Sequence, residues 1–168
     1  MSHASKIQSF IKKKLERDNL TRKVFAKESG IPYATVNKLI NATRANPELK
    51  NIMKIADYYN CAIEKILEGK NNLPKNININ KLSLQEISNN LRNFINNKLK
   101  EDNLNPYKLS RELGFSENPI IEFINNSNKT LSTEVIVELS NRFKTPIDVM
   151  IGRVSLSIQE PQTLGKTE

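Results

Sequence analysis

The chain has 168 residues with a formal net charge of +8, and 38% of its residues are hydrophobic. It contains no run of about 18 apolar residues that would cross a membrane, and no signal-peptide pattern opens it. The single cysteine, Cys61, excludes an internal disulfide and a cysteine-based zinc site, and the single histidine, His3, offers no basis for a Ser-His-Asp triad. We therefore expect no enzyme and no cofactor, and a basic chain whose charge favours an anionic partner.

One pattern occurs twice along the chain. Residues 10–69 and 94–153 align without a gap at an offset of 84 residues, and about 13 of 60 paired positions are identical. This repeat predicts two small domains rather than one of average size. We place them at 1–70 and 83–153, with a linker at 71–82 and a C-terminal tail at 154–168.

Apolar residues at helical spacing predict an all-helical first copy. Its first helix carries an apolar stripe with Ile7, Ile11 and Leu15. Thr21 is a good N-cap for a second helix, which buries Val24 and Phe25 and ends at a left-handed glycine. The remaining expected landmarks are Gly30 at that turn, Pro32 opening the third helix, Asn46 and Pro47 opening the fourth, and Gly69 after a short fifth.

The second copy repeats this plan with different helix boundaries. The expected starts of its five helices are Ser83, Asn105 with Pro106, Ser116, Ser132 and Pro146. Residues 73–81 are rich in Asn and read as a linker, since their two isoleucines cannot anchor a domain. Strand-like alternation is almost absent before residues 154–158, which fit either a short strand or extended chain.

The segment FAKESGIPYATVNKLINATRANP at 25–47 resembles the helix-turn-helix of phage Cro and repressor-type regulators, the XRE class. The matching positions are Ala26, Gly30, Ile31, Val36, Ile40 and Pro47. The resemblance implies two tandem five-helix, lambda-repressor-like domains in a repressor-like transcriptional regulator, cytoplasmic, nucleoid-associated and bacterial or phage-encoded. One departure is Arg22, where many members have a glutamine that bonds a phosphate; an arginine can also meet a phosphate.

The residues themselves also favour DNA binding by the first copy. Thr21 and Arg22 lie at a helix amino end, where free N–H groups favour a phosphate. The third helix is short enough to enter a major groove, where Asn37 can bond an adenine edge and Lys38 a guanine edge or a phosphate. The expected base-contacting residues are Tyr33, Ala34, Thr35, Asn37 and Lys38. The other expected phosphate contacts, placed along the backbone by the resemblance, are Asn41, Thr43, Arg44 and Asn46.

The second copy departs from this pattern where DNA contact is expected. At the positions equivalent to Tyr33, Thr35, Asn37 and Lys38 the second copy has, in that order, Glu117, Pro119, Ile121 and Glu122. Carboxylates facing phosphates weaken binding, and an outward apolar patch is more typical of a protein interface. We therefore expect the second copy to be a degenerate DNA-binding domain that serves dimerisation or sensing. A DNA-binding domain with an unusual sequence preference is the alternative. The expected dimer or partner interface is Ile120, Ile121 and Phe123.

Charge is divided unevenly between the copies. Residues 1–70 hold 14 Lys or Arg against 7 Asp or Glu, whereas residues 84–153 hold 9 of each. This asymmetry is expected when one domain meets a polyanion. The sequence thus predicts a homodimer on a double-stranded DNA operator. The alternatives are a monomeric pseudo-dimer with both copies on DNA, and an antitoxin or adaptor whose second domain binds a partner protein.

Overall fold

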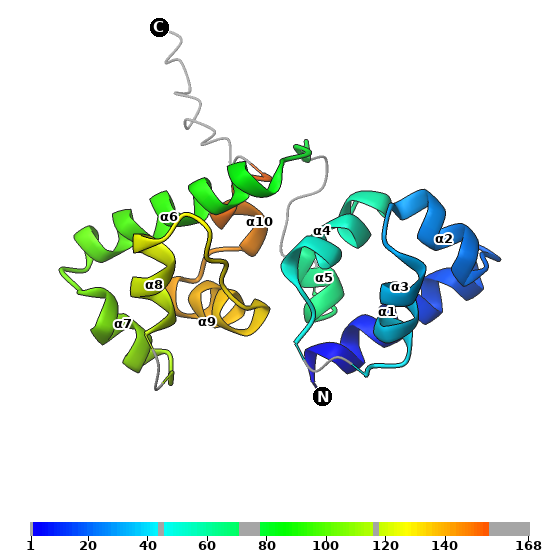
Figure 1. Cartoon of the computed structure of the whole chain (residues 1–168), viewed down its shortest axis with the longest axis horizontal. Coiled ribbons are helices and arrows are strands. Elements are labelled where there is room, and N and C mark those ends of the chain that lie inside the picture. Colours follow the sequence, from blue (N-terminus) through cyan, green and yellow to red (C-terminus); the bar gives the residue numbers. More distant parts are fainter. Residues whose placement is uncertain (1, 44–45, 71–77, 116–117, 155–168) are drawn as a thin grey trace, which may run out of the picture.

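The structure, a computed structural model, describes residues 2–43, 46–70, 78–115 and 118–154. Within these ranges it is built of helices without strands, as the sequence predicts (Figure 1). Residues 155–158, expected to be a strand or extended chain, lie outside the described residues. The part of the chain up to residue 70 is called the N-terminal half, and the part from residue 78 onward is called the C-terminal half.

The helices of the N-terminal half begin and end close to the predicted positions. They are α1 (His3–Arg17), α2 (Arg22–Ser29), α3 (Tyr33–Ile40), α4 (Leu49–Tyr58) and α5 (Ile63–Leu67). The Thr21 hydroxyl accepts from the amide of Val24 at 3.2 Å, which is the expected N-cap of α2. Gly30 ends α2 at φ 66°, the left-handed conformation that glycine adopts without a Cβ penalty.

The C-terminal half has the same order of helices. They are α6 (Leu84–Glu101), α7 (Pro106–Glu112), α8 (Pro119–Asn125), α9 (Thr133–Phe143) and α10 (Ile147–Met150). Ser83 and Glu86 form a capping box at the start of α6. Asn105 caps α7, where Pro106 occupies the first position and needs no amide partner.

Equivalent positions of the two copies make equivalent contacts. The helices α7, α9 and α10 begin 84 residues after α2, α4 and α5. Phe10 meets Tyr59 edge to face at 5.7 Å between ring centroids, and their counterparts Phe94 and Phe143 do the same at 5.8 Å. The sequence repeat is therefore also a repeat of packing.

Two predictions about the N-terminal half are wrong. The helix α4 begins at Leu49 rather than at Asn46 and Pro47, because the first intrahelical carbonyl is that of Glu48, while that of Pro47 accepts from Thr133. Val24 is 39% exposed rather than buried, since α2 turns Phe25 and Ala26 into the core instead.

The two halves pack against each other through one continuous core. Buried side chains of both halves join in a single cluster, and α10 contacts α5. Figure 1 looks nearly along an axis about which a half-turn brings α1 onto α6, α2 onto α7 and α3 onto α8. Part of the expected linker joins this packing, because the amide of Asn80 donates to the carbonyl of Arg153 at 2.9 Å and Ile79 packs near Ala62 and Val154.

Candidate nucleic-acid interface

The helix α3 is held at both ends by the helices around it. Ile31, which is 2% exposed, packs into the core directly after the Gly30 turn. Lys54 of α4 donates to the Gly30 carbonyl at 2.6 Å, and Gln8 of α1 donates to the Ile40 carbonyl at 2.7 Å. These bonds connect the two ends of the segment around α3 to α4 and α1.

One face of α3 is buried and the other is open to solvent. Val36, Leu39 and Ile40 form the buried face. On the opposite side Tyr33 is 53% exposed. The structure brings all five expected base-contacting residues together on the accessible part of this helix: Tyr33, Ala34 and Lys38 are exposed, and Thr35 and Asn37 are half-buried.

The amino end of α2 lies beside this face. The Arg22 guanidinium donates to the Asn37 amide oxygen with an Nη1–Oδ1 distance of 3.2 Å. This bond links an expected phosphate contact to an expected base contact, which the sequence alone did not reveal. Because the amide oxygen faces Arg22, the Asn37 NH₂ group remains as a donor, suited to an acceptor on a base edge.

The loop after α3 continues the same polar surface. Asn41, Thr43 and Asn46 are exposed, and the Thr43 hydroxyl donates to the Lys38 carbonyl at 3.3 Å. Ala42 adopts a left-handed conformation with φ 51°, which turns the chain away from α3. Arg44, the remaining expected phosphate contact, lies outside the described residues.

The equivalent helix α8 does not present the expected apolar interface. Ile120 and Phe123 are 0% and 1% exposed and belong to the core, so the expectation that they form an outward patch is wrong. The helical spacing places them on the inner face of a short helix, where Val36 and Leu39 lie in α3. Ile121 is half-buried.

Charge on the outer side of α8 differs from the sequence-based picture. The exposed Glu122 carboxylate lies 3.3 Å from the Lys129 ammonium, so a cation accompanies it. Glu117 lies outside the described residues. Arg92 stands at the position equivalent to Gln8 and donates to the Phe123 carbonyl at 2.9 Å. The same guanidinium also bonds the carbonyls of Asn126, Ser127 and Lys129, which fixes the loop after α8.

Sequence reasoning missed a buried charge cluster where the two halves meet. Arg153, which is fully buried, donates to the Asp57 carboxylate at 2.9 and 2.7 Å and to the Cys61 carbonyl at 3.1 Å. It also pairs with the buried carboxylate of Asp148. With the nearby buried Glu64, these residues form the Arg153 cluster. The acidic residues at equivalent positions 64 and 148 were a signal for it, since each lies in the first turn of a short helix.

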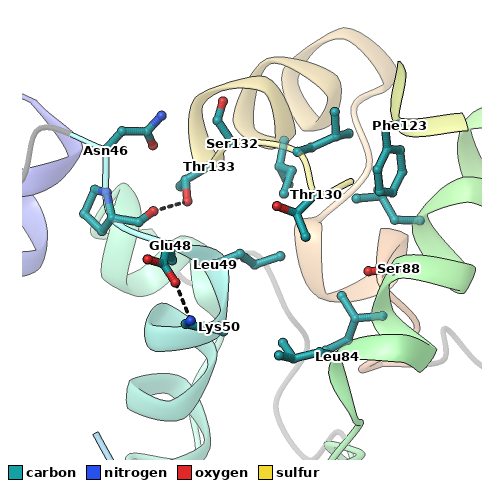
Figure 2. A pocket seen from close by; sticks show the side chains of 15 residues that line it. Asn46, Glu48, Leu49, Lys50, Leu84, Ser88, Phe123, Thr130, Ser132 and Thr133 are labelled. Carbon is teal, nitrogen blue, oxygen red and sulfur yellow. Dashed lines mark hydrogen bonds and ion pairs between the residues drawn. The ribbon is translucent and has the colours of Figure 1, made fainter. Parts of the chain in front are cut away.

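A second contact joins the C-terminal half to the loop before α4. The buried Thr133 hydroxyl donates to the Pro47 carbonyl at 2.5 Å (Figure 2). Beside it lies a groove of about 440 Å³ whose walls include Leu49, Leu84 and Leu131. Asn46, an expected phosphate contact, borders this groove. The C-terminal half thus supports the polar loop that extends from α3.

Comparisons with known proteins find one matching family model and relatives that are similar to part of the chain. A family model described as Helix-turn-helix matches residues 11–66, which span most of the N-terminal half. An uncharacterized HTH-type transcriptional regulator of Rickettsia prowazekii (strain Madrid E) is 36% identical over 73 residues, or 42% of this chain and 79% of that protein. A second uncharacterized HTH-type transcriptional regulator, of Rickettsia conorii (strain ATCC VR-613 / Malish 7), is also 36% identical over 73 residues, which cover 67% of that protein. No solved structure matches the chain.

Other classes of site find little support in the described residues. None of their helices is long and apolar enough to cross a membrane. Nor do the described His, Cys, Asp and Glu side chains form a group that could hold a metal ion. The exposed polar surface of α2, α3 and the following loop is therefore the strongest candidate site in the described part of the chain.

Proposed function

Since the chain belongs to the helix-turn-helix family of DNA-binding transcriptional regulators, we propose that it is a repressor-like protein that reads double-stranded DNA with α3. In this proposal α3 enters the major groove, where Tyr33, Ala34, Thr35, Asn37 and Lys38 face the base edges. The flanking phosphates are contacted by Thr21, Arg22, Asn41, Thr43, Arg44 and Asn46. Asn37 and Lys38 supply most of the sequence preference, because their side chains can donate to base acceptors.

The observation that carries this proposal is the bond between Arg22 and Asn37 on an otherwise open face. It places a fixed cation at the amino end of α2, where free amides already favour an anion, directly beside the donor of Asn37. Asn37 is therefore orientated before DNA arrives, which lowers the entropic cost of binding. The net positive charge of residues 1–70 favours the same partner.

The C-terminal half, in this proposal, assembles the DNA-binding unit rather than reading bases itself. Its α8 has Ile121 and Glu122 where α3 has Asn37 and Lys38, so donors for base edges are missing there. A homodimer built through this half and an adaptor that captures a partner protein remain the other arrangements. With Ile120 and Phe123 in the core, a homodimer would need a surface other than theirs.

The proposed function is tested by selecting duplexes from a random-sequence library with the full-length chain. We expect enrichment of a defined motif, and affinity for that motif that falls steeply as salt rises. Lys38→Ala should reduce affinity for the motif, whereas Glu122→Ala, at the equivalent position of α8, is the matched control and should not. A library that yields no enriched motif would contradict the proposal.

A further inference from the structure

The contact between the two halves is reciprocal. The amide of Ile63, at the start of α5, donates to the Asp148 carboxylate at 2.8 Å. The amide of Ile147, at the start of α10, donates to the Glu64 carboxylate. Ile63 and Ile147 are equivalent positions of the repeat, as are Glu64 and Asp148, each pair being 84 residues apart. Each half thus caps the last helix of the other with the same residue position.

Reciprocity of this kind is the property of a two-fold interface between identical subunits. When residue i of one subunit meets residue j of the other, residue j of the first also meets residue i of the second. The half-turn that relates the helices in Figure 1 is the corresponding rotation. The C-terminal half therefore occupies the position that a second subunit would take in a two-fold dimer.

Arg153 disfavours the same interface between two N-terminal halves. The equivalent position in the N-terminal half is Gly69, so only one arginine reaches the cluster. That guanidinium compensates the carboxylates of Asp57 and Asp148, which come from different halves. Two N-terminal halves paired in the same way would bury Glu64 carboxylates with no arginine, and uncompensated buried charge strongly destabilises an interface.

We propose that one chain is the complete DNA-binding unit, with its C-terminal half in place of a second subunit, and that its target is an asymmetric duplex. This inference rests on the proposed function for the choice of DNA as partner. Because a half-turn about the axis in Figure 1 relates α3 to α8, the two helices lie at the same level along it. α3 reads bases in one segment, and α8 with its following loop contacts the backbone of the adjacent segment.

The surface around α8 suits contact with a backbone but not base reading. The loop after α8 is held by Arg92 and exposes Asn125, Asn126, Asn128 and Lys129. These side chains can donate to phosphate oxygens without selecting a sequence. At the positions that face base edges in α3, α8 has an aliphatic chain, Ile121, and an ion-paired carboxylate, Glu122. Sequence preference should consequently be concentrated in one segment of the target.

The mass of the full chain, free and on DNA, tests this proposal. Sedimentation equilibrium at micromolar concentration should give a single chain of 19.2 kDa, and a duplex selected from a random-sequence library should bind one chain. A stable dimer of the free chain, or two chains on one selected duplex, would overturn it. If the library yields no motif, the proposed function fails, while the free mass still decides whether the internal partner replaces a second copy.

A footprint tests the asymmetry of the target. Hydroxyl-radical protection should cover two adjacent segments on one face of the selected duplex, whereas base substitutions should weaken binding in only one of them. Equal sensitivity in two palindromic segments would overturn the proposal.

Opening the contact between the halves should remove protection of the second segment. Arg153→Ala should abolish that protection and lower affinity by about tenfold or more, because the second grip is lost. Thr133→Val is a milder change that removes the bond to Pro47, and it should weaken the same protection. It serves as the test variant if Arg153→Ala fails to fold. Arg142→Ala is the control, since that arginine is exposed and pairs only within the C-terminal half. A Thr133→Val or Arg153→Ala footprint identical to that of the unaltered chain would count against the proposal.

Discussion

Single side chains on α3 owe their orientation to neighbours outside that helix. Asn37 is held by Arg22 of α2, which lies 15 residues earlier in the chain. The two residues were assigned separately from sequence, one to a base and one to a phosphate. The bond between them makes the two roles interdependent, so substitutions at these positions should not have independent effects.

Asn37→Ala is therefore expected to reduce affinity for the selected motif by roughly 1–3 kcal/mol, because it removes a base-edge donor and releases Arg22. Titration of the motif by fluorescence anisotropy gives this value. Adding Arg22→Ala to Asn37→Ala should cost less than the sum of the two single changes. Ile121→Ala, at the equivalent position of α8, is the control, and strictly additive losses would argue against coupling.

Arg22→Ala tests the phosphate contact. We expect weaker binding to every duplex alike, and a plot of log affinity against log salt whose slope is reduced by about one, because one fewer counterion is released. Measuring the motif and a scrambled duplex at several salt concentrations separates this effect from base reading. A loss confined to the motif would instead assign Arg22 to the bases.

At the scale of elements, helix termini were the most predictable features of this chain. The caps at Thr21, Ser83, Asn105 and Ser132 all accept from an amide three residues later. Such bonds involve neighbouring residues, so the sequence contains all the information they require. The start of α4 was misplaced because a distant residue, Thr133, takes the Pro47 carbonyl.

Gly30→Ala isolates the cost of backbone strain at the turn between α2 and α3. A Cβ at this position would meet no atom within 4 Å, so any loss comes from the φ of 66°. We expect a decrease of roughly 1–2 kcal/mol in the free energy of unfolding, measured by urea denaturation. Gly30→Asn should cost less, since asparagine tolerates this conformation, and an equal loss for both would indicate a cause other than strain.

At the scale of the whole molecule, the Arg153 cluster determines how the two halves are joined. It brings the half-buried Asp57 of α4 together with the buried Glu64 of α5, Asp148 of α10 and Arg153, which follows α10. Burying charges is unfavourable unless each is paired, so such a cluster contributes specificity more than stability. Substitutions that disrupt the Arg153 cluster should therefore show how much the stability of each half depends on the other.

Asp148→Ala removes both the cap of α5 and a partner of Arg153. We expect the free energy of unfolding to fall by about 3–5 kcal/mol, because an arginine is left buried with less compensation. Asp102→Ala is the matched control: that aspartate is 37% exposed and lies 3.5 Å from Arg142, so its loss should cost less than about 1 kcal/mol. Similar losses for both variants would show that the cluster does not hold the halves together.

The same cluster predicts a pH dependence of stability. Burial, reinforced by the charge of Asp148, raises the pKa of Glu64 above its ordinary value of 4.5. The folded protein therefore binds this proton more tightly than the unfolded chain, so the contribution is full below pH 4.5 and is lost as the pH rises toward the raised pKa. Glu64→Gln keeps an oxygen for the Ile147 amide without the charge.

Thermal denaturation of the unaltered chain and of Glu64→Gln, from pH 4.5 up to the raised pKa of Glu64, measures this contribution to stability. The unaltered chain should lose stability relative to Glu64→Gln as the pH rises, since only its side chain must ionise within the buried cluster. A difference between the two melting temperatures that stays constant with pH would rule out Glu64 as the titrating group.

Much of the fold and of the candidate site could be anticipated from local patterns. Apolar periodicity and caps indicated the helices, and the spacing from Ala26 to Ile40 indicated the helix-turn-helix. The error at Ile120 and Phe123 arose because a short helix with apolar residues on several sides does not reveal which side faces inward. Only the position of α8 against the core shows that these two residues are buried.

The all-helical class, the repeat and the family follow from local patterns, because caps, turns and helical spacing depend on residues close together in the chain. Three contacts became apparent only once the helices were packed: Arg22 orients Asn37, Thr133 supports the loop before α4, and Arg153 joins the two halves. These contacts link residues 15, 86 and 96 positions apart. No local pattern encodes such pairs, since their energy arises from burial and pairing once the helices have packed.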